Sequence, residues 1–482
     1  MQYLSTRDSA LRVSAQEAIV RGLAPQSGLF VPETFPQADL DAWKNLSYPE
    51  LAEKVLAGFL TDYSADFLHT ATASTYGAAF GGKAGETVKV RDGLYSLELW
   101  HGPTCAFKDY ALQLMPKLLV EAKKMLGRTE TTRILVATSG DTGKAALAGY
   151  ADLDGIEIEV FYPNDGTSEI QHLQMATQKG ENVQVYAVQG NFDDAQTGVK
   201  KVFADADVAA ELEKRGIRLS SANSINWGRL VPQIVYYFYA YFRLAEQGAV
   251  AWGKPVDFCV PTGNFGDILA GYYAKQMGLP VGKLVCASNK NNVLTDFLTT
   301  GTYDARRTFY KTTSPSMDIL ISSNLERLLC HVSGSSEKVA GWMQELNTTG
   351  KYTVDAETLE KIRETFAAGY ADDAEGAAEI KARFDEDHYL CDTHTAVAFR
   401  VAETVRTEAP MVVLSTASPF KFPRDVLAAL GQQAPASDFA AMAALTARTG
   451  AEAPASLREL DKQEVRFKTV LQPAEIRTAA LK

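Results

Sequence analysis

The sequence has few cysteines and no long apolar run. Its five cysteines, Cys105, Cys259, Cys286, Cys330 and Cys391, show no CxxC spacing. Scattered cysteines of this kind predict neither a zinc site nor a disulfide framework, and an odd number suits a reducing compartment. No window reaches the roughly 20 apolar residues that a membrane-spanning helix needs.

Positive charge is also scarce. The chain carries 59 acidic and 48 basic residues, a net charge of −11. Nucleic acid is therefore excluded as a bulk partner, because a phosphate backbone demands a cationic surface. A local pocket can still bind a small anion. The first residues, MQYLSTRDSALRVS, resemble neither a signal peptide nor a transit peptide, so we expect a cytoplasmic protein that contacts no membrane.

The 482 residues suffice for two or three domains with substantial cores. From about residue 96 the chain alternates between strand-like runs, short glycine-containing turns and helical periodicity. Predicted strands lie at 133–138, 157–162, 182–188, 256–260, 283–287 and 411–415. Such alternation predicts parallel sheets covered by helices, an α/β fold. We expect three domains: 1–95, 96–230 with one α/β unit, and 231–482 with a larger one.

One lysine stands in an unusual place. The segment His101-Gly-Pro-Thr-Cys-Ala-Phe-Lys108-Asp109 ends a strand-like run and opens a helix. Held beside Phe107 and a helix start, the ammonium form of Lys108 would be disfavoured. A neutral lysine is a nucleophile, and its best-known use is a Schiff base to pyridoxal phosphate. Alone, the segment also fits an ordinary lysine at the start of a helix.

A second turn, Thr138-Ser-Gly-Asp-Thr-Gly143, lies between a predicted strand and a helix. Its two glycines allow close backbone approach, and its hydroxyls and carboxylate lie beside free helix N–H groups. Residues of this kind also cap helices. Capping does not need so many of them, so the turn is a candidate ligand site.

Two further turns follow predicted strands. In Pro261-Thr-Gly-Asn-Phe-Gly-Asp267 the glycines would aim successive N–H groups at one point, as in a phosphate cradle, although the loop is neither a Walker sequence nor GxGxxG. Asp267 is unfavourable for an anion, so it would cap the helix or hold the loop. Leu414–Phe422 places hydroxyls past the last strand, and a hydroxyl that faces a pyridine nitrogen leaves it largely unprotonated. The alternative is an ordinary Ser-Pro turn.

The order of these motifs, HGPTxAFKD, SGDTG, GNFGD and STAS, resembles that of the threonine synthases, which are fold-type II pyridoxal-phosphate enzymes. The likeness spans nearly the whole chain, and segments 3–7 and 22–32 are similar to the longer enterobacterial and fungal type. Asp8 stands where glycine is usual, and Cys105 lies at a variable place of the lysine motif. The resemblance implies two open parallel-sheet α/β domains with an additional, mainly helical N-terminal domain.

The resemblance also implies roles for individual residues. Lys108 would form the Schiff base and shuttle protons. The cofactor phosphate would be bound by Gly263, Asn264, Phe265, Gly266 and Asp267, and Thr416 would face the pyridine nitrogen. The substrate contacts would be Ser139, Asp141, Thr142, Asn226 and Arg229. Arginine pairs bidentately with phosphate or carboxylate, although a structural ion pair is an equal alternative for Arg229. We interpret His101 and His394 as structural residues or as supports for residues of the site.

The implied function is conversion of O-phospho-L-homoserine and water to L-threonine and phosphate, with pyridoxal 5'-phosphate as cofactor. Two phosphate-binding places are then expected, one at the GNFGD loop and one near Ser139 and Arg229. A phospho-lyase that releases 2-oxobutyrate, ammonia and phosphate would share the cofactor and fold. An inactive binding protein is a third reading, against which the intact motifs argue. We expect a monomer or a homodimer.

Overall fold

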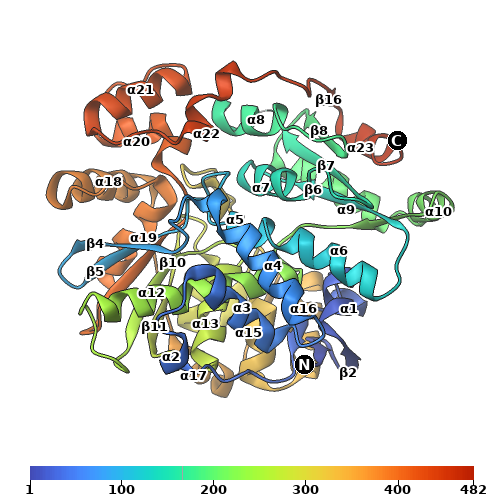
Figure 1. Cartoon of the computed structure of the whole chain (residues 1–482), viewed down its shortest axis with the longest axis horizontal. Helices are drawn as coiled ribbons and strands as arrows, with labels where there is room; N and C mark the ends of the chain where they lie inside the picture. Colours follow the sequence, from blue (N-terminus) through green and yellow to red (C-terminus); the bar gives the residue numbers. More distant parts are fainter. Residues whose placement is uncertain (165–166) are drawn as a thin grey trace.

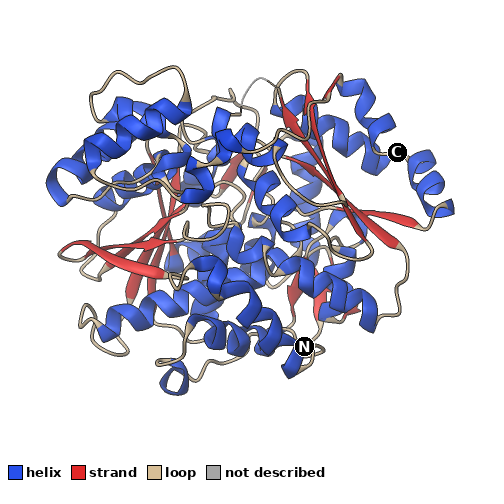
Figure 2. Cartoon of the chain, turned by 45° about the horizontal axis from the view of Figure 1, so that its top comes forward, coloured by secondary structure: helices blue, strands red, loops and turns tan. Residues whose placement is uncertain are grey.

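Two open sheets, separated by helices, form the framework of the molecule (Figure 2). The computed structural model describes residues 1–164 and 167–482. One sheet has six strands in the order β14-β11-β10-β15-β5-β4, and the other has five in the order β16-β8-β7-β6-β9. The predicted α/β class with two open, largely parallel sheets is confirmed.

The six-stranded sheet is parallel except at its β4 edge. Its strands are β14 (Phe366–Tyr370), β11 (Val281–Ser288), β10 (Val256–Pro261), β15 (Met411–Ser415), β5 (Leu94–Glu98) and the antiparallel β4 (Glu86–Arg91). Alternate residues face two cores, as buried strands require. Phe258 and Val260 pack in the core that contains helices α12 (Ile234–Glu246) and α13 (Gly266–Gln276), whereas Cys259 contacts α19 (Thr393–Thr404).

The five-stranded sheet is parallel throughout. Its strands are β16 (Val470–Leu471), β8 (Val183–Val188), β7 (Ile156–Pro163), β6 (Thr131–Ala137) and β9 (Ile217–Ser220). Helix α7 (Asp141–Tyr150) shares one core with it, and α9 (Phe192–Ala204) and α10 (Ala206–Lys214) share the other. The connection from β6 through α7 to β7 is the predicted parallel unit.

The N-terminal part is mainly helical, as predicted. It comprises β1 (Tyr3–Ser5), β2 (Asp8–Val13), α1 (Ala15–Arg21), β3 (Phe30–Pro32), α2 (Leu40–Trp43), α3 (Tyr48–Phe59) and α4 (Ala65–Tyr76). Besides α19, the α-helices and strands after β11 that lie outside the two sheets are α14 (Val293–Thr300), β12 (Thr302–Asp304), α15 (Leu325–Ser333), α16 (Ser336–Thr349), β13 (Lys351–Thr353), α17 (Ala356–Thr365), α18 (Asp373–Asp387), α20 (Pro423–Ala429), α21 (Asp438–Thr449), α22 (Ala455–Arg458) and α23 (Ile476–Ala479).

Each sheet joins segments that are far apart in the sequence. Strand β5 pairs with β15, and the last strand, β16, crosses over to pair with β8 at the far side of the molecule (Figure 1). The division into 1–95, 96–230 and 231–482 stays a prediction, because strand pairing alone does not divide the chain. Strands β5, β15 and β10 are mutually parallel, so their carboxyl ends meet at one edge of the large sheet.

We predict that Gly149 in α7 is essential for packing against the segment that follows Lys108. A Cβ atom at Gly149 would lie 1.9 Å from the carbonyl oxygen of Leu112, so Gly149→Ala must push the two helices apart. We expect a loss of about 1–3 kcal/mol or more in unfolding free energy, measured by urea denaturation. At Gly341, an exposed position of α16, an added Cβ meets no described atom within 4 Å, so Gly341→Ala should instead stabilise by about 0.5–1 kcal/mol. Equal stabilities for the two variants would contradict this packing argument.

Candidate active site

Lys108 lies at the edge where the parallel strands end. It precedes the short helix α5 (Asp109–Leu112), and the chain before it pairs with the segment after β15: the Phe107 N–H donates to the Thr416 carbonyl at 2.9 Å. Its Nζ lies 3.6 Å from the Asp141 carboxylate, 3.4 Å from the Ser316 hydroxyl and 4.7 Å from the centre of the Phe107 ring. The sequence motif is thus a buried turn beside Thr416.

The electrostatic surroundings lower the pKa of Lys108. Burial lowers the pKa of its ammonium group, Asp141 opposes this shift, and the nearby cations Lys421 and Arg229 lower the pKa further. This is the direction expected from the sequence. A lysine in this environment supplies a free amine for nucleophilic attack or proton transfer more readily than an exposed one.

Asp141 connects two buried lysines. Its Oδ1 accepts hydrogen bonds from Lys421 at 2.7 Å and from the Gln171 side chain at 2.9 Å, while Oδ2 faces Lys108. Burial alone would raise the pKa of Asp141, but the two ammonium groups outweigh it and hold that pKa well below the usual range. Asp141 is therefore a fixed negative charge between two cations.

Lys421 is the residue that sequence reasoning missed. Its side chain is fully buried, and its Nζ also donates to the Thr104 carbonyl at 3.2 Å. The signal was present, because Lys421 stands among apolar residues in Pro419-Phe-Lys-Phe422. A lysine that is buried in such a run needs a charged partner.

Asp109 fixes the turn that carries Lys108. Its carboxylate accepts the Thr104 backbone N–H at 2.8 Å, the Thr104 hydroxyl at 2.7 Å and the Gln113 amide at 3.0 Å, and burial raises its pKa to about 6. A Cβ at Gly102 would lie 2.5 Å from this carboxylate, so the motif requires glycine there. Cys105, the variable position of the motif, has a left-handed φ of +60°.

The loop of residues 263–267 has the geometry of an anion cradle. Phe265 adopts a left-handed φ of +62° directly before α13. Bonds from Ser322 to the Gly263 carbonyl at 2.7 Å and from the Asn324 N–H to the Asn264 carbonyl at 3.0 Å fix its course. Among the described residues, none accepts a hydrogen bond from the backbone N–H groups of 263–267. A row of free N–H groups at a helix start fits the phosphate of pyridoxal phosphate.

The structure explains why Asp267 is tolerated in this loop. Its Oδ1 accepts hydrogen bonds from the hydroxyls of Tyr236 at 2.5 Å and Tyr237 at 3.2 Å, and burial raises its pKa to about 7. The carboxyl is thus bound to the tyrosines of α12, and burial favours its neutral form more than in an exposed aspartate. It anchors the start of α13, and its predicted place in the phosphate loop stays a prediction.

The Ser316 segment is supported by His394. The His394 Nε2 accepts the Ser316 backbone N–H at 3.2 Å, and its Nδ1 lies 2.9 Å from Asp392. This arrangement agrees with the interpretation of His394 as a supporting residue. Thr416 donates its N–H to the Thr395 hydroxyl at 3.3 Å, so the predicted pyridine partner lies beside the same helix, α19.

Arg229 is a buried cation in the short helix α11 (Trp227–Leu230). Burial lowers its pKa to about 10; one terminal nitrogen donates to the Ala222 carbonyl, and its Nε has no partner within the described chain. No carboxylate among the described residues pairs with it, so the structure does not favour the ion-pair alternative. A buried guanidinium with unused donors suits an anionic substrate.

The remaining predicted substrate residues have different environments. Asn226 is buried and uses both side-chain groups on the chain itself, donating to the Ile19 carbonyl and accepting the Gly228 N–H, each at 2.9 Å. It therefore caps α11, which carries Arg229. Ser139 and Thr142 are half-buried beside the start of α7. Their contacts with substrate stay predictions.

Family models match most of the chain. They are the threonine synthase N terminus at residues 2–76, the pyridoxal-phosphate dependent enzyme at 84–359 and the threonine synthase C-terminal model at 395–479. The threonine synthase of Pseudomonas aeruginosa is 40% identical over 443 residues, which cover 90% of this chain and 92% of that protein. The chain belongs to the threonine synthase family.

Solved structures and longer relatives agree with this assignment. The pyridoxal-phosphate-bound threonine synthase of Brucella melitensis superposes with a TM-score of 0.89 at 38% identity and covers 100% of this chain and 99% of its own. The yeast threonine synthase gives 0.88 at 34%, covering 99% and 97%. Human threonine synthase-like 1 is 40% identical over 455 residues, which are 89% of this chain. The match covers only 60% of the length of that protein. The central region of the chain matches the family of pyridoxal-phosphate dependent enzymes. Among its described helices, none is long and apolar enough to cross a bilayer.

We predict that Lys421 and Asp141 are energetically coupled. Lys421→Met leaves the buried Asp141 with only one charged partner, Lys108, and should cost about 3–5 kcal/mol of unfolding free energy. Adding Asp141→Asn removes the stranded charge, so the double variant should lose less than the sum of the two single losses. Urea denaturation of the four proteins measures this difference, and strict additivity would contradict the coupling.

Proposed function

We propose that this protein converts O-phospho-L-homoserine and water to L-threonine and phosphate. The observation that carries the proposal is the position of buried Lys108. Its Nζ lies 3.6 Å from Asp141 and 3.4 Å from Ser316, and the loop with free N–H groups packs against Ser316 at Gly263. The relatives named threonine synthase support it, because the likeness extends over nearly the whole length of both chains.

The residues present fit pyridoxal phosphate. Lys108 would hold its aldehyde carbon, the N–H groups of 263–267 its phosphate, and Thr416 would face its ring nitrogen. When bound, the cofactor supplies an electron sink that stabilises negative charge on the substrate carbon atoms. The hydroxyl of Thr416, unlike a carboxylate, does not favour protonation of that nitrogen.

Proton transfer falls to Lys108. In its neutral form Nζ accepts the proton from the substrate α-carbon, and as an ammonium group it returns a proton later. Asp141 lies 3.6 Å from Nζ and balances the charge of the protonated form, while Lys421 keeps Asp141 ionised and in place. The pKa of Lys108 therefore reflects two opposing effects: burial lowers it and the carboxylate of Asp141 raises it.

Anion binding falls to Arg229 and the start of α7. A proton leaves the substrate β-carbon and phosphate leaves the γ-carbon. Water then adds at the β-carbon and the γ-carbon takes up a proton, so the released phosphate needs a second anion site beside that of the cofactor phosphate. The unused donors of Arg229, with the hydroxyls of Ser139 and Thr142, would hold the leaving group. Asn226 would position Arg229 by capping its helix. We further propose a cytoplasmic monomer or homodimer.

A product balance tests the proposed reaction. The holoenzyme is incubated with O-phospho-L-homoserine, and phosphate, threonine and 2-oxobutyrate are measured together. We expect threonine equal to phosphate. Phosphate matched by 2-oxobutyrate would identify a phospho-lyase instead, and no product would contradict both reactions.

We predict that Lys108→Ala lowers turnover at least about a thousandfold, because both the covalent anchor and the proton shuttle are lost. The visible absorbance of the lysine-bound cofactor should also disappear from the purified protein. Lys108→Arg keeps a cation but cannot bond to the cofactor aldehyde, so it should be equally inactive. Full activity in either variant would exclude this role.

We predict that Arg229→Gln raises KM for the phosphorylated substrate about ten- to hundredfold, since a buried charge partner of the anion is lost. The inhibition constant of inorganic phosphate should rise by a similar factor. Asn226→Ala should raise KM less and lower stability by about 1 kcal/mol, because it removes a helix cap. An unchanged KM in Arg229→Gln would place the substrate anion elsewhere.

A further inference from the structure

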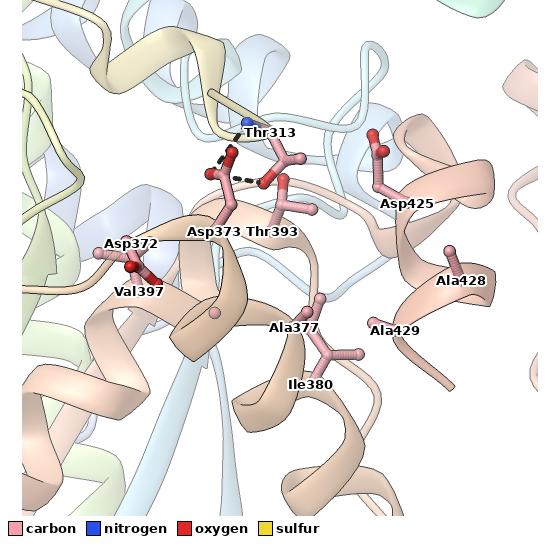
Figure 3. A pocket seen from close by; sticks show the side chains of 11 residues that line it. Thr313, Asp372, Asp373, Ala377, Ile380, Thr393, Val397, Asp425, Ala428 and Ala429 are labelled. Carbon is pink, nitrogen blue, oxygen red and sulfur yellow. Dashed lines mark hydrogen bonds between the residues drawn. The ribbon is translucent and has the colours of Figure 1, made fainter. Parts of the chain in front are cut away.

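A second pocket lies between helices α18, α19 and α20, and its lining residues do not include Lys108 or the 263–267 loop (Figure 3). Its volume is about 240 Å³. The walls are apolar, formed by Ile380, Val397 and small residues of α18 and α20. A cavity of this size and lining suits a small molecule with a short alkyl body.

The polar groups of this pocket are acidic or hydroxylic. Asp372, Asp373 and Asp425 line it together with Thr313 and Thr393, and the described lining residues include no lysine, arginine or histidine. Asp373 Oδ1 accepts the Thr313 N–H at 3.2 Å and its hydroxyl at 3.1 Å. The net character is strongly negative, so anionic ligands are excluded.

Thr393 supplies an independent sign of a missing partner. Thr393 is only 5% exposed, and its hydroxyl has no hydrogen-bond partner within the described chain. In Figure 3 this hydroxyl points toward Thr313, on the side of the pocket where the Asp373 carboxylate lies. A buried hydroxyl without a partner costs free energy, which a bound donor or acceptor recovers.

A metal ion does not fit these groups. The described residues contain no cluster of three or more side chains arranged to hold one. The combination of separated carboxylates, an unpaired hydroxyl and apolar walls instead matches an organic cation with an N–H donor.

We propose that this pocket binds a small alkylammonium ion. Its N–H group would bond to Thr393 and Asp373, Asp425 would add attraction from α20, and the alkyl body would pack on Ile380 and Val397. The bound ion would link three helices of the C-terminal part. It would also contact two segments of the active site, because Thr313 lies three residues before Ser316 and Thr393 lies directly before His394.

The test uses the holoenzyme and N,N-dimethylbutylammonium. This tertiary amine keeps one N–H donor but cannot bond to the cofactor aldehyde, so binding at Lys108 does not interfere. Isothermal titration calorimetry should show saturable binding, and the melting temperature should rise with ligand concentration. N,N-dimethylbutanamide, which is uncharged and of similar size, should do neither at the same concentrations.

Two variants locate the binding. Thr393→Val, which is isosteric, and Asp425→Asn, on an exposed position of α20, should each weaken binding about two- to fivefold. Asp461→Asn, an exposed carboxylate outside the pocket, should bind as the wild type does. Equal binding of the amide, absence of saturable binding, or affinities unchanged in both pocket variants would overturn the proposal. These outcomes are independent of the product balance.

Discussion

The chemistry of this protein depends on one buried charge array, in which Asp141 lies between Lys421 and Lys108. A carboxylate at this depth is stable only because two ammonium groups compensate its desolvation. In return it holds both lysines in defined positions. The array joins three segments that are distant in the sequence, the turn before α5, the start of α7 and the turn after β15. The charge array can therefore form only when these three segments come together.

The backbone around this array is restricted by close approaches. The segment before Lys108 pairs with the one after β15, and Gly149 lets α7 approach the carbonyl of Leu112 directly. At Gly263 a Cβ would lie 2.7 Å from the Ser316 carbonyl, which brings the anion loop against the segment that contacts Lys108. Small residues thus set the distances between the parts of the site, and charged residues set the protonation state within it.

The proposed cofactor and substrate parts of the site differ in the groups that they offer to an anion. The 263–267 loop offers backbone N–H groups, whose direction is fixed by the left-handed Phe265 and by the tyrosine-bound Asp267. Arg229 offers a buried side-chain cation whose helix is capped by Asn226. The pocket at α18–α20 has the opposite charge preference, and it adjoins the same helix, α19, that carries His394. If both proposals hold, the anion-binding groups at α11 and α13 and the cation pocket at α18–α20 lie on separate elements of the threonine synthase framework.

The sequence alone determined the local features: the parallel strands, the turns after them and the unusual place of Lys108, since periodicity and turn residues act over a few positions. It also indicated the family, because four motifs occur in a fixed order. It did not reveal Lys421 as the partner of Asp141, the tyrosines that bind Asp267, or the use of Asn226 as a cap. Each of these depends on which distant side chain fills a buried hydrogen-bonding position. Only the tertiary structure decides that, because the cost of burying a charge is set by the neighbours that folding brings to it.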